Sequence, residues 1–448
     1  MSGSRSRSFL WHPFTQMQGW ASEGAPVIER GEGAWLFDTN GRRYIDGVSS
    51  LWCNVHGHRH AGIDAAVRSQ LERVAHTTML GLSHEPAEEL ARRLIEIAPQ
   101  PFALERGRGP LSRVFYSDSG STAVEIALKM AFQYWRQADD ARPSRTRFIS
   151  LEDAYHGDTV GSVSVGGIEL FHSLYRPLLF DTFKVPAGDA DALEDMLAHH
   201  CEEVAAVVIE PLVQGAAGIR LQPPGYLRFV RELCDRYGVF LICDEVATAF
   251  GRTGSMFACE HEGVVPDFLC LAKGLTGGYL PLAATLTTER VHEAFLGEHD
   301  QFRTFFHGHT YTGNPLACAA AIATLEAFQQ ERTLERLQPK IRLFEELLEE
   351  LVAPLPHVAE VRRAGFMCGI ELAAQPARAV AYEPALRIGH RVTVEARSRG
   401  AIVRPLGDVL VLMPPLAILP DELEELVEIT ADSIVAATEQ TAALAAAA

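Results

Sequence analysis

Two apolar runs, Val239-Phe-Leu-Ile-Cys-Asp244 and Phe268-Leu-Cys-Leu-Ala-Lys273, decide the fold. Each run is apolar at every position until it ends in one charged residue. A short apolar run without alternation is typical of a strand buried on both faces, as in a parallel sheet. Open α/β sheets bind their ligands beyond the carboxyl ends of the strands. The two runs therefore predict buried strands that bring Asp244 and Lys273 to the ligand-binding edge of one sheet.

The same pattern continues on either side of these runs. Further strands are predicted at Val114–Tyr116, Arg147–Ser150 and Val204–Glu210, with helices between strands at Thr122–Trp135 and Tyr226–Tyr237. Continuous apolar strands that alternate with helices indicate an α/β fold, in which a mostly parallel sheet is covered by helices on both faces.

The character of the sequence changes near both ends. An Asn40-Gly41 step between two β-rich runs predicts a tight hairpin. Beyond about residue 335 the chain becomes a Leu/Glu-rich helix, and short strands follow near Phe366–Leu372 and Val409–Met413. We therefore expect a large domain with the central sheet and a smaller α+β domain built from both termini. The predicted divisions are an N-terminal segment of the small domain at 1–69, the large domain at 70–335 and the C-terminal small domain at 336–448.

Composition narrows the class of protein. A length of 448 residues suggests two or three domains, and the formal net charge of −18 argues against a nucleic acid partner. No apolar stretch is long enough to span a bilayer, and the basic residues near the start precede no apolar signal region. The eight cysteines form no C-x-x-C pair, which predicts reduced thiols, no metal centre and a cytoplasmic location.

Three features carry chemistry. Ser117-Asp-Ser-Gly-Ser121 lies between a predicted strand and a helix, where free N–H groups and small hydroxyls can cradle an anion. A serine-rich helix cap with no ligand is equally common. Asp244 alone could be a helix cap or a structural ion pair. Lys273 alone could extend its amine to solvent, although a partly buried lysine has a lowered pKa and becomes a nucleophile that forms Schiff bases.

The three features together are far more specific than any one of them. Pyridoxal phosphate needs an anion cradle for its phosphate, a lysine for its aldehyde and a carboxylate that keeps the pyridine nitrogen protonated. The sequence therefore predicts a pyridoxal 5'-phosphate site with Lys273 and Asp244 at its centre.

Other motifs extend this prediction along nearly the whole chain, which resembles the fold-type I, class III aminotransferases. The segments that carry the resemblance are Tyr155-His-Gly-Asp158, Ile209-Glu-Pro211, Asp244-Glu-Val-Ala-Thr-Ala-Phe-Gly-Arg-Thr-Gly254, Lys273 with its glycines, and His307-Gly-His-Thr-Tyr-Thr-Gly-Asn-Pro315. The resemblance implies that Gly120 and Ser121 hold the phosphate and that Tyr155 lies against the pyridine ring, with catalytic roles for Lys273, Asp244 and Tyr155. It also implies that Thr310 reaches the phosphate of the other subunit, hence a homodimer with shared active sites.

Within the class, the chain resembles the branch that works in biotin biosynthesis. The markers are Trp11-His-Pro-Phe-Thr15, Ser49-Ser-Leu-Trp52, Asp118-Ser-Gly-Ser-Thr-Ala-Val-Glu125, Lys129-Met-Ala-Phe-Gln-Tyr-Trp135, Arg404-Pro-Leu-Gly407 and Met413-Pro-Pro415. This resemblance implies a small-molecule ketone with a long apolar chain that ends in a carboxylate. The implied substrate-binding residues are Trp52, Phe14, Tyr155, Gly308 and Arg404, with Arg404 on the carboxylate.

Several alternatives stay open. The amino donor is S-adenosylmethionine or L-lysine, because Phe14 and Val411 stand where members that use S-adenosylmethionine carry tyrosine. A class III ω-aminotransferase for diamines or β-amino acids is the second interpretation. The third is a catalytically silent binding protein with the same fold, against which the retained Lys273, Asp244 and anion cradle argue.

Overall fold

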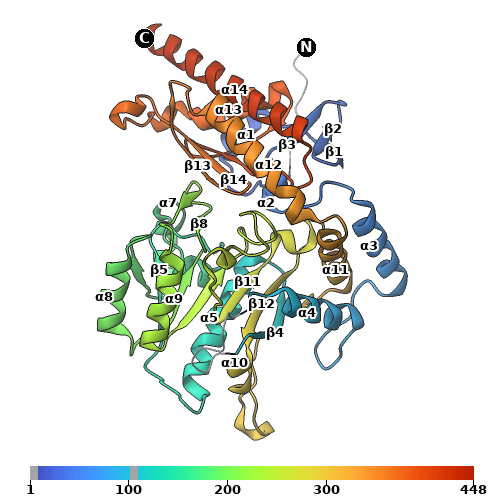
Figure 1. Cartoon of the computed structure of the whole chain (residues 1–448), viewed down its shortest axis with the longest axis vertical. Helices are drawn as coiled ribbons and strands as arrows, with labels where there is room; N and C mark the ends of the chain where they lie inside the picture. Colours follow the sequence, from blue (N-terminus) through green and yellow to red (C-terminus); the bar gives the residue numbers. More distant parts are fainter. Residues whose placement is uncertain (1–8, 101–108, 448) are drawn as a thin grey trace.

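The larger part of the molecule is built on a seven-stranded sheet. A computed structural model describes residues 9–100 and 109–447 of the chain. Figure 1 shows this sheet in the lower part of the molecule. In spatial order its strands are β4 (Leu111–Ser117), β12 (Ala283–Thr288), β11 (Phe268–Leu271), β10 (Phe240–Asp244), β7 (Val204–Ile209), β5 (Arg147–Leu151) and β6 (Phe183–Val185).

The sheet is mostly parallel, as the sequence predicts. Only β12 runs against its neighbours β11 and β4, and the other pairs are parallel. All five strands predicted for this sheet are present within a few residues of the expected bounds. The sequence analysis missed β12 and β6. The first consists of alanine, threonine and one leucine and the second has three residues, so neither presents a long apolar run.

Helices cover both faces of the sheet because successive strand residues point to opposite sides. On one face, Val208 and Ile242 pack with the predicted helix α5 (Gly120–Gln137) in one core cluster. On the other, Val207 and Leu241 belong to a second cluster with residues of α4 (Glu85–Ile97), α8 (Ala190–His200), α9 (Tyr226–Tyr237) and α11 (Pro315–Gln330).

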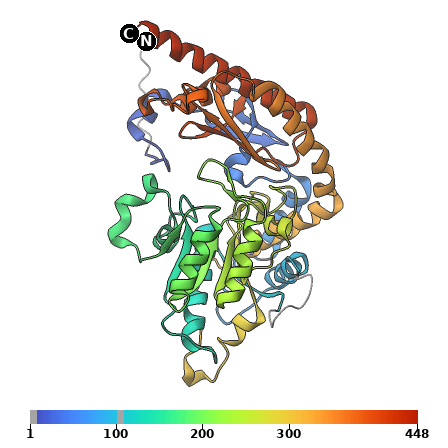
Figure 2. The ribbon, with the colours of Figure 1, turned by 60° about the vertical axis from the view of Figure 1, so that its left-hand side comes forward.

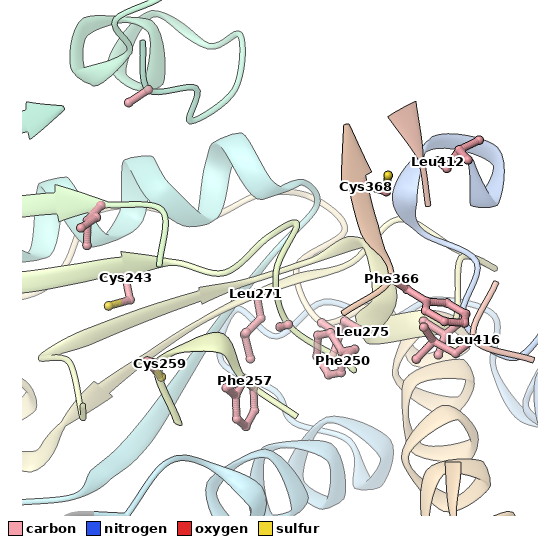
Figure 3. Close-up of a cluster of buried hydrophobic side chains, with 14 of the residues drawn as sticks. Cys243, Phe250, Phe257, Cys259, Leu271, Leu275, Phe366, Cys368, Leu412 and Leu416 are labelled. Atoms are coloured by element: carbon pink, nitrogen blue, oxygen red, sulfur yellow. The ribbon is translucent and has the colours of Figure 1, made fainter. Parts of the chain in front are cut away.

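The second core cluster extends out of the sheet into the C-terminal part. Figure 3 shows Phe250 and Leu275, which follow the ends of β10 and β11, near Phe366 and Leu416 of the C-terminal part. All four side chains are at most 1% exposed. The two parts of the molecule therefore share one continuous apolar core next to the carboxyl ends of the strands.

The smaller part combines both ends of the described chain. One four-stranded sheet joins β1 (Ile28–Glu32), β2 (Trp35–Asp38) and β3 (Arg43–Asp46) to β15 (Ala401–Ile402), and β2 and β3 form the predicted hairpin. A second sheet contains β13 (Val358–Ala364), β14 (Met367–Leu372), β17 (Val409–Leu412) and β16 (Arg404–Leu406). Figures 1 and 2 show β1–β3 beside the C-terminal helices α13 (Ile388–Arg399) and α14 (Pro420–Ala447). The domain limits near residues 69 and 335 stay a prediction.

The remaining elements connect these layers. They are α1 (Met17–Glu23), α2 (Ser49–Trp52), α3 (Ala61–Arg73), α6 (Val160–Val165), α7 (Glu169–His172), α10 (Glu289–Glu293), α12 (Thr333–Leu347) and the short pair β8 (Val213–Gln214) and β9 (Arg220–Leu221). Over residues 9–100 and 109–447, no helix is both long and apolar enough to cross a bilayer. Within the same ranges, no three His, Cys, Asp or Glu side chains are grouped to hold a metal ion.

A buried ion pair that anchors α9 to the sheet gives a test of the fold. Arg231 Nη1 lies 2.8 Å from Asp267 Oδ2, and the side chains are 9% and 5% exposed. The same oxygen accepts the N–H of Leu241 in β10 at 2.8 Å. Arg231→Met removes the guanidinium that faces a buried carboxylate, so we expect a loss of about 3–5 kcal/mol in the free energy of unfolding, measured by urea titration.

The matched control is Arg142→Met. Arg142 pairs with Glu202 at 3.1 Å, and these side chains are 49% and 69% exposed. Exposed pairs contribute less than about 1 kcal/mol. Equal losses in the free energy of unfolding would show that the pair of Arg231 and Asp267 stabilises the fold no more than an exposed pair does.

Candidate active site

One cavity of about 700 Å³ opens at the carboxyl ends of β10 and β11. Its lining residues come from six segments of the chain, within 52–53, 118–121, 155–159, 210–216, 244–248 and 272–282. The predicted site residues that line it are Trp52, Gly120, Ser121, Tyr155, Asp244 and Lys273. The sequence therefore identified residues that are far apart in the chain and close together in the fold.

Lys273 follows the end of β11 and starts a short 3-10 helix, Lys273–Thr276. Its φ of 46° is in the left-handed region, so the backbone turns sharply where the side chain enters the cavity. The amine lies 4.7 Å from the centre of the Trp52 ring. Burial lowers the pKa of Lys273, although the nearby carboxylates of Asp244 and Glu210 oppose that shift. A larger fraction of this amine is therefore neutral, and so nucleophilic, than in an exposed lysine.

Asp244 is the last residue of β10 and is 5% exposed. Its Oδ1 accepts the Val246 N–H at 3.1 Å, and its Oδ2 lies 2.7 Å from His156 Nδ1. His156 is 2% exposed, and its Nε2 has no hydrogen-bond partner among the described residues. These contacts fix the orientation of the carboxylate at the wall of the cavity.

The start of α5 forms the anion cradle. Ser119 caps the helix, because its Oγ accepts the Thr122 N–H while Thr122 Oγ1 accepts the Ser119 N–H. At Gly120 a Cβ would lie 2.4 Å from Val246 Cγ1, so only glycine allows this approach. Ser121 Oγ contacts Thr159 Oγ1 at 2.8 Å and accepts the Thr159 N–H at 3.0 Å. The helix thus begins at the cavity with small residues and polar groups suited to a phosphate.

Tyr155 and Trp52 supply the aromatic walls. The Tyr155 hydroxyl donates to Asp158 Oδ2 at 2.7 Å, and burial raises the pKa of this phenol, which keeps it protonated. The His172 ring lies nearly parallel to the Tyr155 ring, at 12°. Trp52 is 7% exposed, and its Nε1 has no hydrogen-bond partner in the described structure.

Two residues of the site received no role in the sequence analysis. Glu210 accepts the N–H groups of Tyr155 at 3.1 Å and Gly215 at 3.0 Å, and burial raises its pKa to about 7. His156 is the partner of Asp244. Both stand in motifs that the sequence analysis quoted. Glu210 also follows a buried strand directly, which is the same signal that singled out Asp244.

Four predicted residues lie outside the cavity lining. Arg404, in β16, is half-buried with an Nε that lacks a hydrogen-bond partner in the described structure, and burial lowers its pKa while Tyr155 opposes the shift. Phe14 is 60% exposed and contacts Phe171 edge to face. Gly308 and Thr310 are exposed, and the Thr310 carbonyl accepts a hydrogen bond from the His76 ring at 3.0 Å. Their predicted roles in binding stay predictions.

Comparison with known proteins agrees with this geometry. Residues 19–434 match the family model for class-III aminotransferases. The chain is 58% identical to an adenosylmethionine-8-amino-7-oxononanoate aminotransferase of Nitratidesulfovibrio vulgaris, over 97% of this chain and 82% of the relative. It is 51% identical to the protein of the same name from Aquifex aeolicus, over 94% of each chain.

Solved structures give the same result. The crystal structure of adenosylmethionine-8-amino-7-oxononanoate aminotransferase from Methanocaldococcus jannaschii matches with a TM-score of 0.91 at 44% identity, over 96% of this chain and 97% of that chain. A PLP-bound amine transaminase from an uncultivated Pseudomonas species matches with a TM-score of 0.87 at 36% identity, over 97% of this chain and all (100%) of that chain. The chain belongs to the class-III aminotransferase family and is a pyridoxal-phosphate-dependent aminotransferase.

Proposed function

We propose that this enzyme transfers an amino group onto 8-amino-7-oxononanoate and so forms 7,8-diaminononanoate, a step of biotin biosynthesis. Relatives that are 50–58% identical over 94–97% of the chain are named for this substrate. The observation that carries the proposal is the arrangement of one cavity, in which a buried amine, a buried carboxylate and an anion cradle meet two aromatic walls. Arg404 interacts electrostatically with Tyr155, and its Nε has no hydrogen-bond partner in the described structure.

The residues of this cavity fit pyridoxal 5'-phosphate. The start of α5 at Gly120 and the Ser121 hydroxyl would hold the phosphate, because free N–H groups and the helix dipole favour an anion. Asp244, oriented by His156, would keep a proton on the pyridine nitrogen. Tyr155 would lie against the ring. When bound, the cofactor supplies an aldehyde and an electron-accepting ring.

Lys273 would attach the cofactor and move the proton. The lowered pKa of Lys273 increases the fraction of neutral amine at neutral pH, and the neutral form is both the nucleophile and the base. The free Nζ would serve as the base that takes the proton from the amine-bearing carbon of the donor and as the acid that afterwards gives this proton up. The Trp52 ring close to Nζ limits access of water to this proton.

Arg404 would recognise the carboxylate of the substrate. A half-buried guanidinium whose Nε lacks a partner is suited to a carboxylate, and the contact repays the cost of its burial. Trp52 and Tyr155 would pack against the apolar chain of the substrate. Phe14, which contacts Phe171 at a ring-centroid distance of 5.5 Å, would close the outer end.

The working enzyme would be a cytoplasmic homodimer with shared active sites. Gly308 and Thr310 line no part of the described cavity and lie beside exposed Phe306 and Tyr311 (73% and 59% exposed). A cluster of exposed aromatic residues favours a protein interface. Thr310 of the partner subunit would then reach the phosphate. The eight cysteines form no disulfide, as suits a reducing compartment.

A class III ω-aminotransferase is the second candidate. Its support is an omega transaminase from Pseudomonas jessenii that matches this chain with a TM-score of 0.89 at 29% identity, over 96% of this chain and 97% of that chain. Turnover of 8-amino-7-oxononanoate separates the two candidates.

The attachment of the cofactor can be tested by reduction. Borohydride should fix the cofactor covalently to the wild-type holoenzyme, and mass mapping should find it on Lys273. Lys273→Ala should show no adduct and lose transamination by several orders of magnitude. Lys184→Met is the matched control, because burial lowers the pKa of that amine to about 7 although it lies outside the cavity. An adduct on Lys184 instead of Lys273 would show that the assignment is wrong.

The role of Arg404 can be tested with two ketones. Arg404→Met should lower kcat/KM for 8-amino-7-oxononanoate by about ten- to a hundredfold, since a hydrogen bond to a charged group contributes about 1.5–3 kcal/mol. For an analogue with a methyl group in place of the carboxylate, kcat/KM should be the same in the variant as in the wild type. Equal losses for both ketones would contradict carboxylate recognition by Arg404, and a wild type inactive with 8-amino-7-oxononanoate would favour the ω-aminotransferase.

The donor is S-adenosylmethionine or L-lysine, and single-turnover absorbance can decide it. Phe14 and Val411 lack the hydroxyls of tyrosine, and Val411 pairs in register with Arg404 at the substrate end. Two lost neutral hydrogen bonds of about 0.5–1.5 kcal/mol each would weaken S-adenosylmethionine by about ten- to a hundredfold. We expect lysine to convert the cofactor to its amine form at least as efficiently. A strong response to S-adenosylmethionine with none to lysine would refute this prediction.

A further inference from the structure

The segment that carries Trp52 has an unusual backbone. Ser49, Ser50 and Trp52 have φ angles of 50°, 63° and 63°, and Ser50 combines its angle with a ψ of −72°. Residues with a Cβ rarely adopt positive φ, and three of them within four positions cost free energy that the surroundings must offset. Such a segment keeps its shape only if something else holds it.

Asp46 is the residue that holds this segment. Its side chain is fully buried, at the end of β3. Both carboxylate oxygens accept the Ser50 N–H at 2.8 Å, and Oδ2 also accepts the Ser50 hydroxyl at 3.2 Å. His58 Nε2 lies 2.9 Å from the same oxygen, and its Nδ1 lies 3.0 Å from Asn54 Nδ2. The carboxylate thus holds the strained backbone at Ser50, and His58 in turn holds the carboxylate.

The clamped segment delivers a single side chain to the active site. The Trp52 ring centre is 4.7 Å from Lys273 Nζ. Gly215 lies beside the ring, and because a Cβ there would come within 3.3 Å of Trp52 Cζ3, the lack of a side chain at this position makes room for the indole. The Ser49 hydroxyl donates to the Met413 carbonyl at 2.6 Å and fixes the other side of the segment.

We propose that Asp46 is a positioning residue for catalysis: through the strained segment 49–52 it holds the indole of Trp52 over the amine of Lys273 and so keeps that amine shielded from water. The proposal rests on the role of Lys273 in the proposed function. The shielding of the amine from water exists before any cofactor is bound. The positioning role of Asp46 and the proposed function can therefore fail separately.

The indole has two opposed effects on Lys273. Its face attracts an ammonium ion, and its bulk excludes the water that would hydrate that ion. Burial is the largest influence on the Lys273 pKa and lowers it, against the charges of Asp244 and Glu210 and the thiol of Cys53, while Arg252 acts in the same direction as burial. Displacing the indole should therefore raise the pKa of Lys273 toward its ordinary value, because exclusion of water is the stronger effect.

The test is the pH dependence of Lys273 modification in the cofactor-free full-length protein. Reductive methylation with formaldehyde and cyanoborohydride proceeds on the neutral amine, and mass spectrometry of the Lys273 peptide gives the midpoint. We expect the midpoint to rise by about one pH unit in Asp46→Ala. A smaller rise is expected in Asp46→Asn, which keeps one acceptor oxygen and serves if the alanine variant does not fold.

Two comparisons separate positioning from a general loss of structure. Asp38 is a buried aspartate of the same sheet that holds the turn after β2 through the N–H groups of Asn40 and Arg42. Asp38→Asn should leave the Lys273 midpoint unchanged. Trp52→Leu should raise the midpoint by itself, and adding Asp46→Ala to it should change nothing more.

Each result bears on the proposal. A midpoint that does not rise in folded Asp46 variants overturns it. So does a rise of equal size in Asp38→Asn, or a further rise when Asp46→Ala is added to Trp52→Leu. The borohydride experiment on Lys273 is independent, because it reports where the cofactor attaches and says nothing about the segment 49–52.

Discussion

The burial of the Lys273 amine beside the Asp244 carboxylate is the constraint on which the site depends. Asp244 ends β10 and Lys273 follows the end of β11, and these two strands are adjacent and parallel, with Asp244 opposite Cys270. Each charge would be costly to bury alone, and each lowers the cost of the other. The sheet can place them together because continuous apolar strands end at one edge, where backbone and side chains both turn toward the cavity.

Part of this arrangement comes from outside the central sheet. Trp52, which lines the cavity, belongs to the N-terminal segment, and this segment packs against the C-terminal one. The hydrogen bond from Ser49 to the Met413 carbonyl joins the two segments directly, and β15 pairs with β3 beside them. The continuous core around Phe250 and Phe366 holds the smaller part of the molecule against the sheet (Figure 3). The small part of the molecule is therefore a structural component of the active site.

Sequence reasoning was accurate where one local pattern sufficed. Apolar runs gave five strands of the sheet, and the charged residues after β10 and β11 gave Asp244 and Lys273. It missed β12, because alanine and threonine form a strand only through pairing with β4 and β11. The pairing of His156 with Asp244 spans 88 residues of chain, and no spacing rule connects them. Family resemblance proposed Thr310 and Gly308, and in the fold of one chain they lie outside the cavity.

The charges of the cavity also explain why the part around Lys273 differs from the part at the start of α5. Lys273 faces both Asp244 and Glu210, and two ionised carboxylates near one amine would leave a buried negative charge. Burial raises the pKa of Glu210 to about 7, so this residue can be neutral while it still accepts two backbone N–H groups. The side chains at this end can therefore be close to charge balance. A phosphate brings further negative charge, and backbone N–H groups at the start of α5 can bind it without adding another buried cation. Backbone N–H groups do not titrate near neutral pH, so a change in the charge of Lys273 would leave these donors of the proposed phosphate site in place.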